Sequence, residues 1–157
     1  MSNPSIDPLM ALLGQAERER DNAQALLQQA IDNARAAQGQ ADQLIAYRAE
    51  YEARFREQFS RNSSVAILQC YQGFSSRLTQ AIEQQKQITA HAERKVEQAR
   101  GALLDEEMRV ASVRKLLERR LTEQRIAADR RDQKQTDEFA ARAAWAALQQ
   151  RSVTPVA

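Results

Sequence analysis

The sequence Ser60-Arg61-Asn62-Ser63-Ser64 is the densest cluster of turn-favouring residues in the interior of this 157-residue chain. Serine and asparagine favour turns and helix caps because their short polar side chains hydrogen-bond to nearby backbone groups. Ser63 or Ser64 is suited to cap a helix that follows. We therefore predict that the chain bends at about residues 61–64, with one long helix on each side.

The segment before the bend has the apolar pattern of a coiled-coil seam, in which apolar residues recur at alternating steps of four and three. Asp7 is suited to the N-cap and Pro8 to the first helical position, so the helix is expected over about residues 8–60. Alanine dominates the middle of the seam, which predicts a close approach of a partner helix. The seam positions are Leu9, Leu13, Ala16, Arg20, Ala23, Leu27, Ala30, Ala34, Ala37, Ala41, Leu44, Arg48, Tyr51, Phe55 and Gln58.

The segment after the bend repeats this pattern. Its seam positions are Leu68, Tyr71, Ser75, Leu78, Ile82, Gln85, Thr89, Ala92, Val96, Ala99, Leu103, Glu106, Val110, Val113 and Leu117. In an antiparallel hairpin centred near residue 63, facing residues have numbers that add to about 126, so Leu9 faces Leu117. A short separate helix around residues 65–75 would shift this register.

Residues 118–150 contain no glycine or proline, so the second helix is expected to continue to about residue 150 as an overhang without a partner. A disordered C-terminal tail follows. The predicted fold is all-α: one coiled-coil domain over residues 1–157, built as a long antiparallel two-helix hairpin with a C-terminal helical overhang.

Composition excludes several other classes of protein. The three prolines lie at positions 4, 8 and 155, and only four glycines are present, which is too few turn residues for a β-rich domain. A net charge of +2 with interspersed signs does not indicate nucleic-acid binding. The single cysteine, Cys70, fits a reducing cytoplasm. Leu9 to Leu13 is too short an apolar run for a signal peptide or a membrane span, so no direct membrane insertion is expected.

The sequence contains no recognisable catalytic or cofactor-binding pattern. His91 is the only histidine, and a solvated helix position explains it better than a catalytic role. A zinc site needs more histidine and cysteine ligands than one of each. Neither a GxGxxG sequence nor a P-loop is present. We predict a protein that is not an enzyme and that uses no metal or cofactor.

Two apolar features exceed the needs of a bare hairpin. Phe74, Leu78, Ala81 and Ile88 form a row on the flank of the second seam, which indicates either a docking stripe or a wide seam or local three-helix tip. Phe139 and Trp145 bring aromatic side chains to the overhang, which indicates burial against a partner. The alternative there is an oligomer contact or a fold-back.

Three blocks of sequence resemble the FliJ family of flagellar type III export proteins along essentially the whole chain. They are Leu44-Ile45-Ala46-Tyr47-Arg48-Ala49-Glu50-Tyr51; Tyr71-Gln72-Gly73-Phe74 with Leu78 and Ala81-Ile82-Glu83-Gln84; and Asp132-Gln133-Lys134 with Asp137-Glu138-Phe139-Ala140-Ala141-Arg142-Ala143-Ala144.

The resemblance implies a coiled coil similar to the central stalk subunit of rotary ATPases. Such a stalk enters the ring of the flagellum-specific export ATPase, whose regulator is a further partner, contacts the membrane export gate and escorts the chaperones of filament-type substrates. It is monomeric when alone, and cytoplasmic with peripheral association at the inner face of the cell membrane. Carried over by position, the gate-docking residues are Phe74, Leu78, Ala81 and Gln85, the last standing where some relatives have histidine. The ring-binding residues on the overhang are Asp132, Gln133, Lys134, Asp137, Glu138, Phe139 and Arg142.

The sequence leaves other functions open. The equivalent stalk of a virulence-type secretion system is built in the same way. A generic homodimeric coiled-coil scaffold would instead be a parallel and much longer rod, and an enzyme is the remote third reading.

Overall fold

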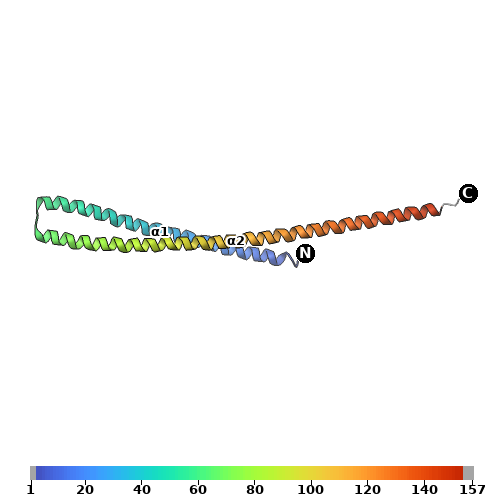
Figure 1. The fold of residues 1–157 in the computed structure, drawn as a ribbon, viewed down its shortest axis with the longest axis horizontal. Helices are drawn as coiled ribbons and strands as arrows, with labels where there is room; N and C mark the ends of the chain where they lie inside the picture. The colour runs from blue at the N-terminus through green and yellow to red at the C-terminus, as the bar shows by residue number, and fades with distance from the viewer. Residues whose placement is uncertain (1–2, 154–157) are drawn as a thin grey trace. The chain divides into compact units, whose positions relative to one another are not determined.

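The computed structural model describes residues 3–153, and these form two long helices and no strand. Helix α1 spans Asp7–Arg61 and helix α2 spans Val65–Ser152 (Figure 1). The chain divides into two compact units. One is Ala16–Arg109, and the other combines the described parts of Met1–Gln15 and Val110–Ala157.

Capping hydrogen bonds lie at the start of each helix. Those of α1 are on Asn3 and not on the predicted Asp7, which is itself the first residue of the helix. The backbone oxygen of Asn3 accepts hydrogen bonds from the amides of Ile6 and Asp7, and a carboxylate oxygen of Asp7 accepts one from the amide of Asn3 at 3.0 Å. The Ser64 hydroxyl accepts a hydrogen bond from the amide of Ile67 at 3.2 Å. Ser64 is thus the residue that caps α2.

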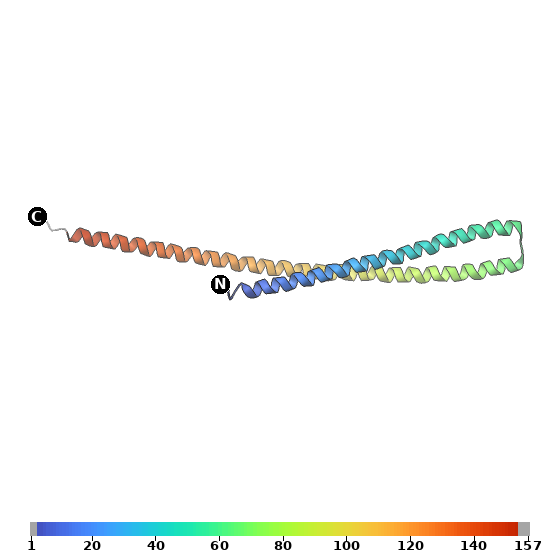
Figure 2. The same cartoon turned by 180° about the vertical axis from the view of Figure 1, so that it is seen from behind.

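The unit Ala16–Arg109 is an antiparallel hairpin, in which the two helices lie side by side from both directions of view (Figures 1 and 2). Of the thirty seam positions predicted above, Gln58 alone is fully exposed. Phe55 stacks on Tyr71 with ring centroids 3.7 Å apart, and these residue numbers add to the predicted 126. The buried residues of this unit are Ala16, Ala23, Ala37 and Ala41 from α1, and Leu78, Ile82, Gln85, Thr89 and Val96 from α2.

The second unit pairs the start of α1 with part of α2. Ile6, Val110 and Val113 are its buried residues, and the Gln124 side chain donates a hydrogen bond to the Ser5 hydroxyl at 3.1 Å. All residues from 129 to 153 are exposed, although α2 continues to Ser152. This exposed part of α2 is the overhang. It begins after Ala128, later than the predicted residue 118, because Gln124 and Ala128 are partly buried.

The predicted fold class, an all-α antiparallel two-helix hairpin with a C-terminal helical overhang, is confirmed. Residues 65–75 belong to α2 itself and not to a separate helix. The assignment of the chain to a single domain stays a prediction. The C-terminal tail expected to be disordered lies, from residue 154, outside the described residues.

Candidate partner-binding surfaces

The row predicted to dock on the export gate lies largely within the hairpin seam. Leu78 is only 7% exposed, and Phe74 and Ala81 are partly buried. The Phe74 ring contacts the Tyr51 ring at a centroid distance of 4.3 Å and meets Tyr47 edge to face at 6.3 Å. An incoming partner therefore has access to parts of Phe74 and Ala81, while Leu78 supports the surface from beneath.

Gln85 is also buried in this row, with 9% of its surface exposed. Its amide nitrogen donates hydrogen bonds to the backbone oxygen of Ala37 at 3.0 Å and to the side-chain oxygen of Gln40 at 3.3 Å. The hydroxyl of buried Thr89 donates to the backbone oxygen of Gln85 at 3.0 Å. The side chain of Gln85 thus joins the two helices; the sequence pattern placed it in the seam but did not indicate these hydrogen bonds.

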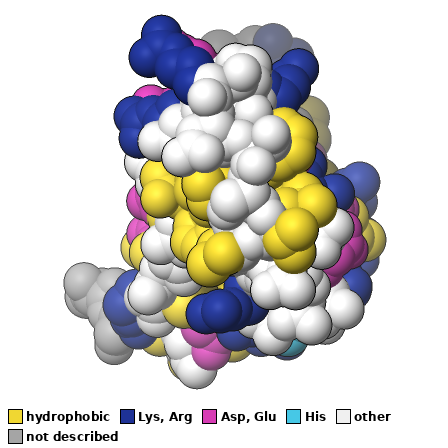
Figure 3. All heavy atoms as spheres, turned by 90° about the vertical axis from the view of Figure 1, so that its left-hand side faces the viewer, with side chains coloured by type: hydrophobic (Ala, Val, Ile, Leu, Met, Phe, Trp, Pro, Cys, Tyr) yellow, Lys and Arg dark blue, Asp and Glu magenta, His cyan; other side chains and the backbone are white. Residues whose placement is uncertain are grey.

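The tip of the hairpin carries an aromatic cluster of Tyr51, Phe55, Phe59 and Tyr71. Seen end-on, hydrophobic side chains gather at the middle of this face with basic side chains around them (Figure 3). Tyr51, Phe55 and Phe59 follow one another at intervals of four residues. This spacing is the feature of the sequence that could have predicted the aromatic cluster. The cluster borders an open pocket of about 290 Å³, lined by Tyr51, Phe55, Gln58, Ala66, Ile67, Cys70 and Tyr71.

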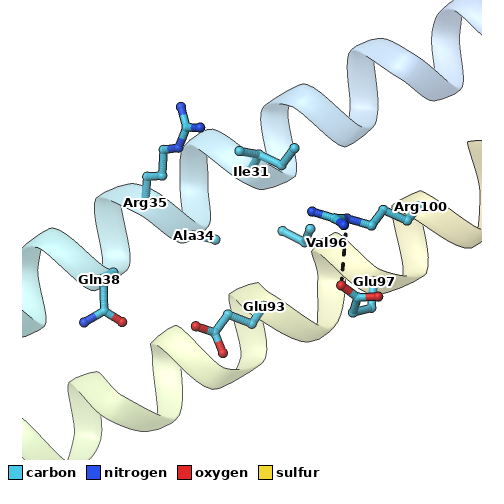
Figure 4. Close-up of a pocket in the computed structure, with 8 residues that line it drawn as sticks. All are labelled: Ile31, Ala34, Arg35, Gln38, Glu93, Val96, Glu97 and Arg100. Atoms are coloured by element: carbon cyan, nitrogen blue, oxygen red, sulfur yellow. Dashed lines mark ion pairs between the residues drawn. The ribbon is translucent and has the colours of Figure 1, made fainter.

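Two shallow grooves follow the alanine-rich middle of the hairpin. One has a volume of about 480 Å³, with Ile31, Ala34, Arg35 and Gln38 on α1 facing Glu93, Val96, Glu97 and Arg100 on α2 (Figure 4). The Arg100 and Glu97 side chains of this groove pair with each other at 3.8 Å. The other groove has exposed Leu26 and Ile88 on its walls and includes His91. Alanine on α1 leaves both grooves open because it fills little of the space between the helices.

Nothing in the described part of the chain groups three or more histidine, cysteine or carboxylate side chains around a possible metal position. His91 is exposed on the wall of an open groove. No helix among residues 3–153 has the length and apolar character needed to cross a bilayer.

The predicted ring-binding residues are all exposed on the overhang. The Gln133 amide donates to the Asp137 carboxylate at 3.1 Å, and the Thr136 hydroxyl donates to the backbone oxygen of Asp132 at 2.9 Å. Both bonds join residues one turn apart within α2. Phe139 is 75% exposed, so a large aromatic ring stands in solvent between charged side chains. The overhang is therefore a charged helix with one highly exposed phenylalanine among the predicted ring-binding residues.

Comparison with known proteins gives one consistent result. Residues 5–149 match the family model described as "Flagellar FliJ protein". A relative of that name from Escherichia coli (strain K12) is 32% identical over 136 residues, covering 87% of this chain and 92% of the relative. A second, from Salmonella typhi, is 31% identical over 129 residues, covering 82% of this chain and 88% of the relative. No solved structure gives a significant match.

Proposed function

The chain belongs to the flagellar FliJ protein family, and on this basis we propose that it is a non-catalytic component of the flagellar type III protein export apparatus. In this proposal it is a stalk needed for flagellum assembly and motility. It inserts into the ring of the export ATPase and stimulates hydrolysis, contacts the export gate, and escorts substrate chaperones. These contacts hold it at the inner face of the cell membrane.

The observation that carries the ATPase part of the proposal is the overhang. A solvated helix of this kind gains little stability by itself, since most helical stability in proteins comes from packing of an apolar face. A ring that surrounds the helix would supply that packing. Exposed Phe139 has the character of an interface anchor, and the neighbouring Asp132, Lys134 and Arg142 offer charges of both signs.

The decisive test is to shorten the chain after Asp129 and measure hydrolysis by the export ATPase of the same organism. We expect stimulation to be lost because the segment that enters the ring is missing. The point variant Phe139→Ala should reduce stimulation in the same direction. Leu104→Ala, which truncates an exposed apolar side chain on the hairpin, is the matched control and should leave stimulation unchanged. Full stimulation by the shortened chain would contradict the proposal.

The gate contact calls for a different variant. Leu78→Ala would mix a docking effect with loss of stability because Leu78 is buried in the seam. Ala81 is small, partly buried and belongs to the same predicted row as Phe74. Ala81→Glu therefore adds a bulky charged side chain at the proposed contact. We expect this variant to fold and to lose swimming motility in soft agar. Gln84→Glu adds a carboxylate at an exposed neighbouring position and should swim normally; equal motility of the two strains would remove the support for this site.

A further inference from the structure

Charged side chains interrupt the seam of the hairpin unit at the end away from its tip. Arg20 and Glu106 both occupy seam positions, and their numbers add to 126, so they belong to the same level of the two helices. Arg109 on α2 donates a hydrogen bond to Glu19 on α1 at 2.9 Å, which supports this alignment. We call Glu19, Arg20, Glu106 and Arg109 the charged layer. All four residues lie in the unit Ala16–Arg109.

The two seam residues of the charged layer do not pair across the seam. Within the described residues, Arg20 donates two hydrogen bonds to Asp21, its neighbour on α1, at 3.0 and 3.1 Å. A carboxylate oxygen of Glu106, Oε2, is buried and accepts no hydrogen bond, and its ion pair is with Arg109 on the same helix at 3.6 Å. A buried carboxylate oxygen without a donor costs free energy, and charges at seam positions replace apolar contacts. The charged layer is therefore a weak level in the pairing of α1 with α2.

The second unit, in which the start of α1 pairs with part of α2, buries few apolar side chains. Ile6, Val110 and Val113 are its buried residues within the described chain. Gly14 is a poor helix former, so the start of α1 gains little stability from its own backbone. Three leucines at seam positions of this unit are only partly buried: Leu9, Leu13 and Leu117. A segment with few buried apolar contacts opens locally at a lower free energy than the rest of a protein.

We propose that the charged layer is a conformational device, which lets residues 7–15 of α1 separate from residues 110–124 of α2 while the hairpin unit stays closed. A continuous seam would couple the two openings, and the charged layer breaks that continuity. The separated state exposes Val110 and Val113, so the unpaired part of α2 begins near residue 110 instead of after Ala128. The inference concerns the isolated protein and does not rest on the proposed function.

Pulsed electron spin resonance between two spin labels measures this opening. In a Cys70→Ser background, which removes the only cysteine, one protein carries labels at Met10 and Leu116 and a second carries them at Gln38 and Ile88. The numbers in each pair add to 126, and all four positions are exposed, so the labels leave the seam intact. We expect the first pair to show a longer distance in addition to a short one, and the second pair to show the short distance alone.

An apolar layer in place of the charged one tests the cause. Arg20→Leu combined with Glu106→Leu makes this exchange, which is often neutral or stabilising at buried ion pairs. We expect the longer distance of the first label pair to lose about threefold or more of its population, because the closed state gains apolar burial. Arg18→Leu combined with Glu107→Leu makes the same exchange at exposed neighbouring positions and should leave the distances unchanged.

Hydrogen exchange of the unlabelled chain gives an independent measurement. Amides of residues 7–15 should exchange faster than those of residues 78–96, and the leucine pair at the charged layer should slow them. A short distance alone from the first label pair would overturn the proposal. So would a longer distance of equal population from both label pairs, because the whole hairpin would then be opening. Equal effects of the layer variant and its exposed control would show that the charged layer is not the cause.

Discussion

Gln85 is a polar side chain within an otherwise mostly apolar part of the seam, next to Ile82 and Leu78. Its hydrogen bonds to Ala37 and Gln40 on α1 form in the alignment of the two helices that the structure has. A buried polar residue of this kind selects a coiled-coil register because other registers leave its donors unpaired. The alanine-rich stretch of α1 offers few large side chains that would fix the register by shape.

Replacing Gln85 by glutamate tests this role. The new carboxylate would meet the Ala37 and Gln40 oxygens, both acceptors, in a buried site, so we expect a loss of about 1–3 kcal/mol in the free energy of unfolding at neutral pH. The loss should be smaller in acid, where the protonated carboxyl again supplies a donor. Urea unfolding followed by circular dichroism at both pH values measures this. Gln84→Glu, at an exposed position, is the control and should change stability little.

At the scale of the elements, α1 and α2 contribute side chains of different size to the seam. In the hairpin unit the buried positions of α1 are all alanine, whereas α2 supplies Leu78, Ile82 and Val96. Larger side chains of α2 thus fill part of the space that the alanines of α1 leave, and the rest stays open as the two grooves. The tip differs, because Tyr51, Phe55 and Tyr71 stack across the two helices and hold them further apart by their size.

The unequal seam predicts where truncation is costly. Ile82 is 1% exposed, so Ile82→Ala should lower the free energy of unfolding of the chain by about 2–3 kcal/mol, through lost burial and the cavity left behind. Ile88 lies on the same helix but is exposed, and Ile88→Ala should cost less than about 0.5 kcal/mol. Thermal and urea unfolding of the two variants under the same conditions gives the comparison. Similar losses from both would show that the seam does not lie where the structure has it.

At the scale of the whole molecule, the predicted ring-binding residues lie outside the packed part of the chain, whereas the predicted gate row lies within it. Residues 16–109 form a unit with a continuous seam, in which the predicted gate row is embedded. Residues 129–153 are exposed throughout and hold the predicted ring-binding residues. Truncation of the overhang is therefore expected to remove a binding surface without removing buried contacts.

This division predicts the stability of the chain shortened after Asp129. Its urea midpoint should equal that of the full-length protein, since the described residues that are removed, 130–153, are all exposed. Its helical circular dichroism signal per molecule should fall in proportion to the helical residues removed. A lower midpoint would mean that the overhang contributes to folding, and the ATPase experiment with this variant would then need the point variant Phe139→Ala to separate the two effects.

The sequence by itself determined the bend, the two seams and the overhang. These features rest on local rules: serine caps, the spacing of apolar residues along a helix, and the absence of proline, which act wherever the segment lies. The Ser64 cap and the pairing of Phe55 with Tyr71 follow from such rules, and so does the existence of the overhang, although its start after Ala128 does not.

Tertiary structure alone decided which residues of a seam or row are accessible. Leu78 and Phe74 lie one turn apart in the sequence, yet Leu78 is buried while Phe74 rests on Tyr51 with part of its ring available. Gln85 read as a binding residue, but it donates its hydrogen bonds to α1. The physical reason is that burial and hydrogen bonding depend on the side chains that the opposite helix brings to each level. These opposing side chains come from residues far apart in the sequence, so a local sequence pattern cannot predict which of them meet.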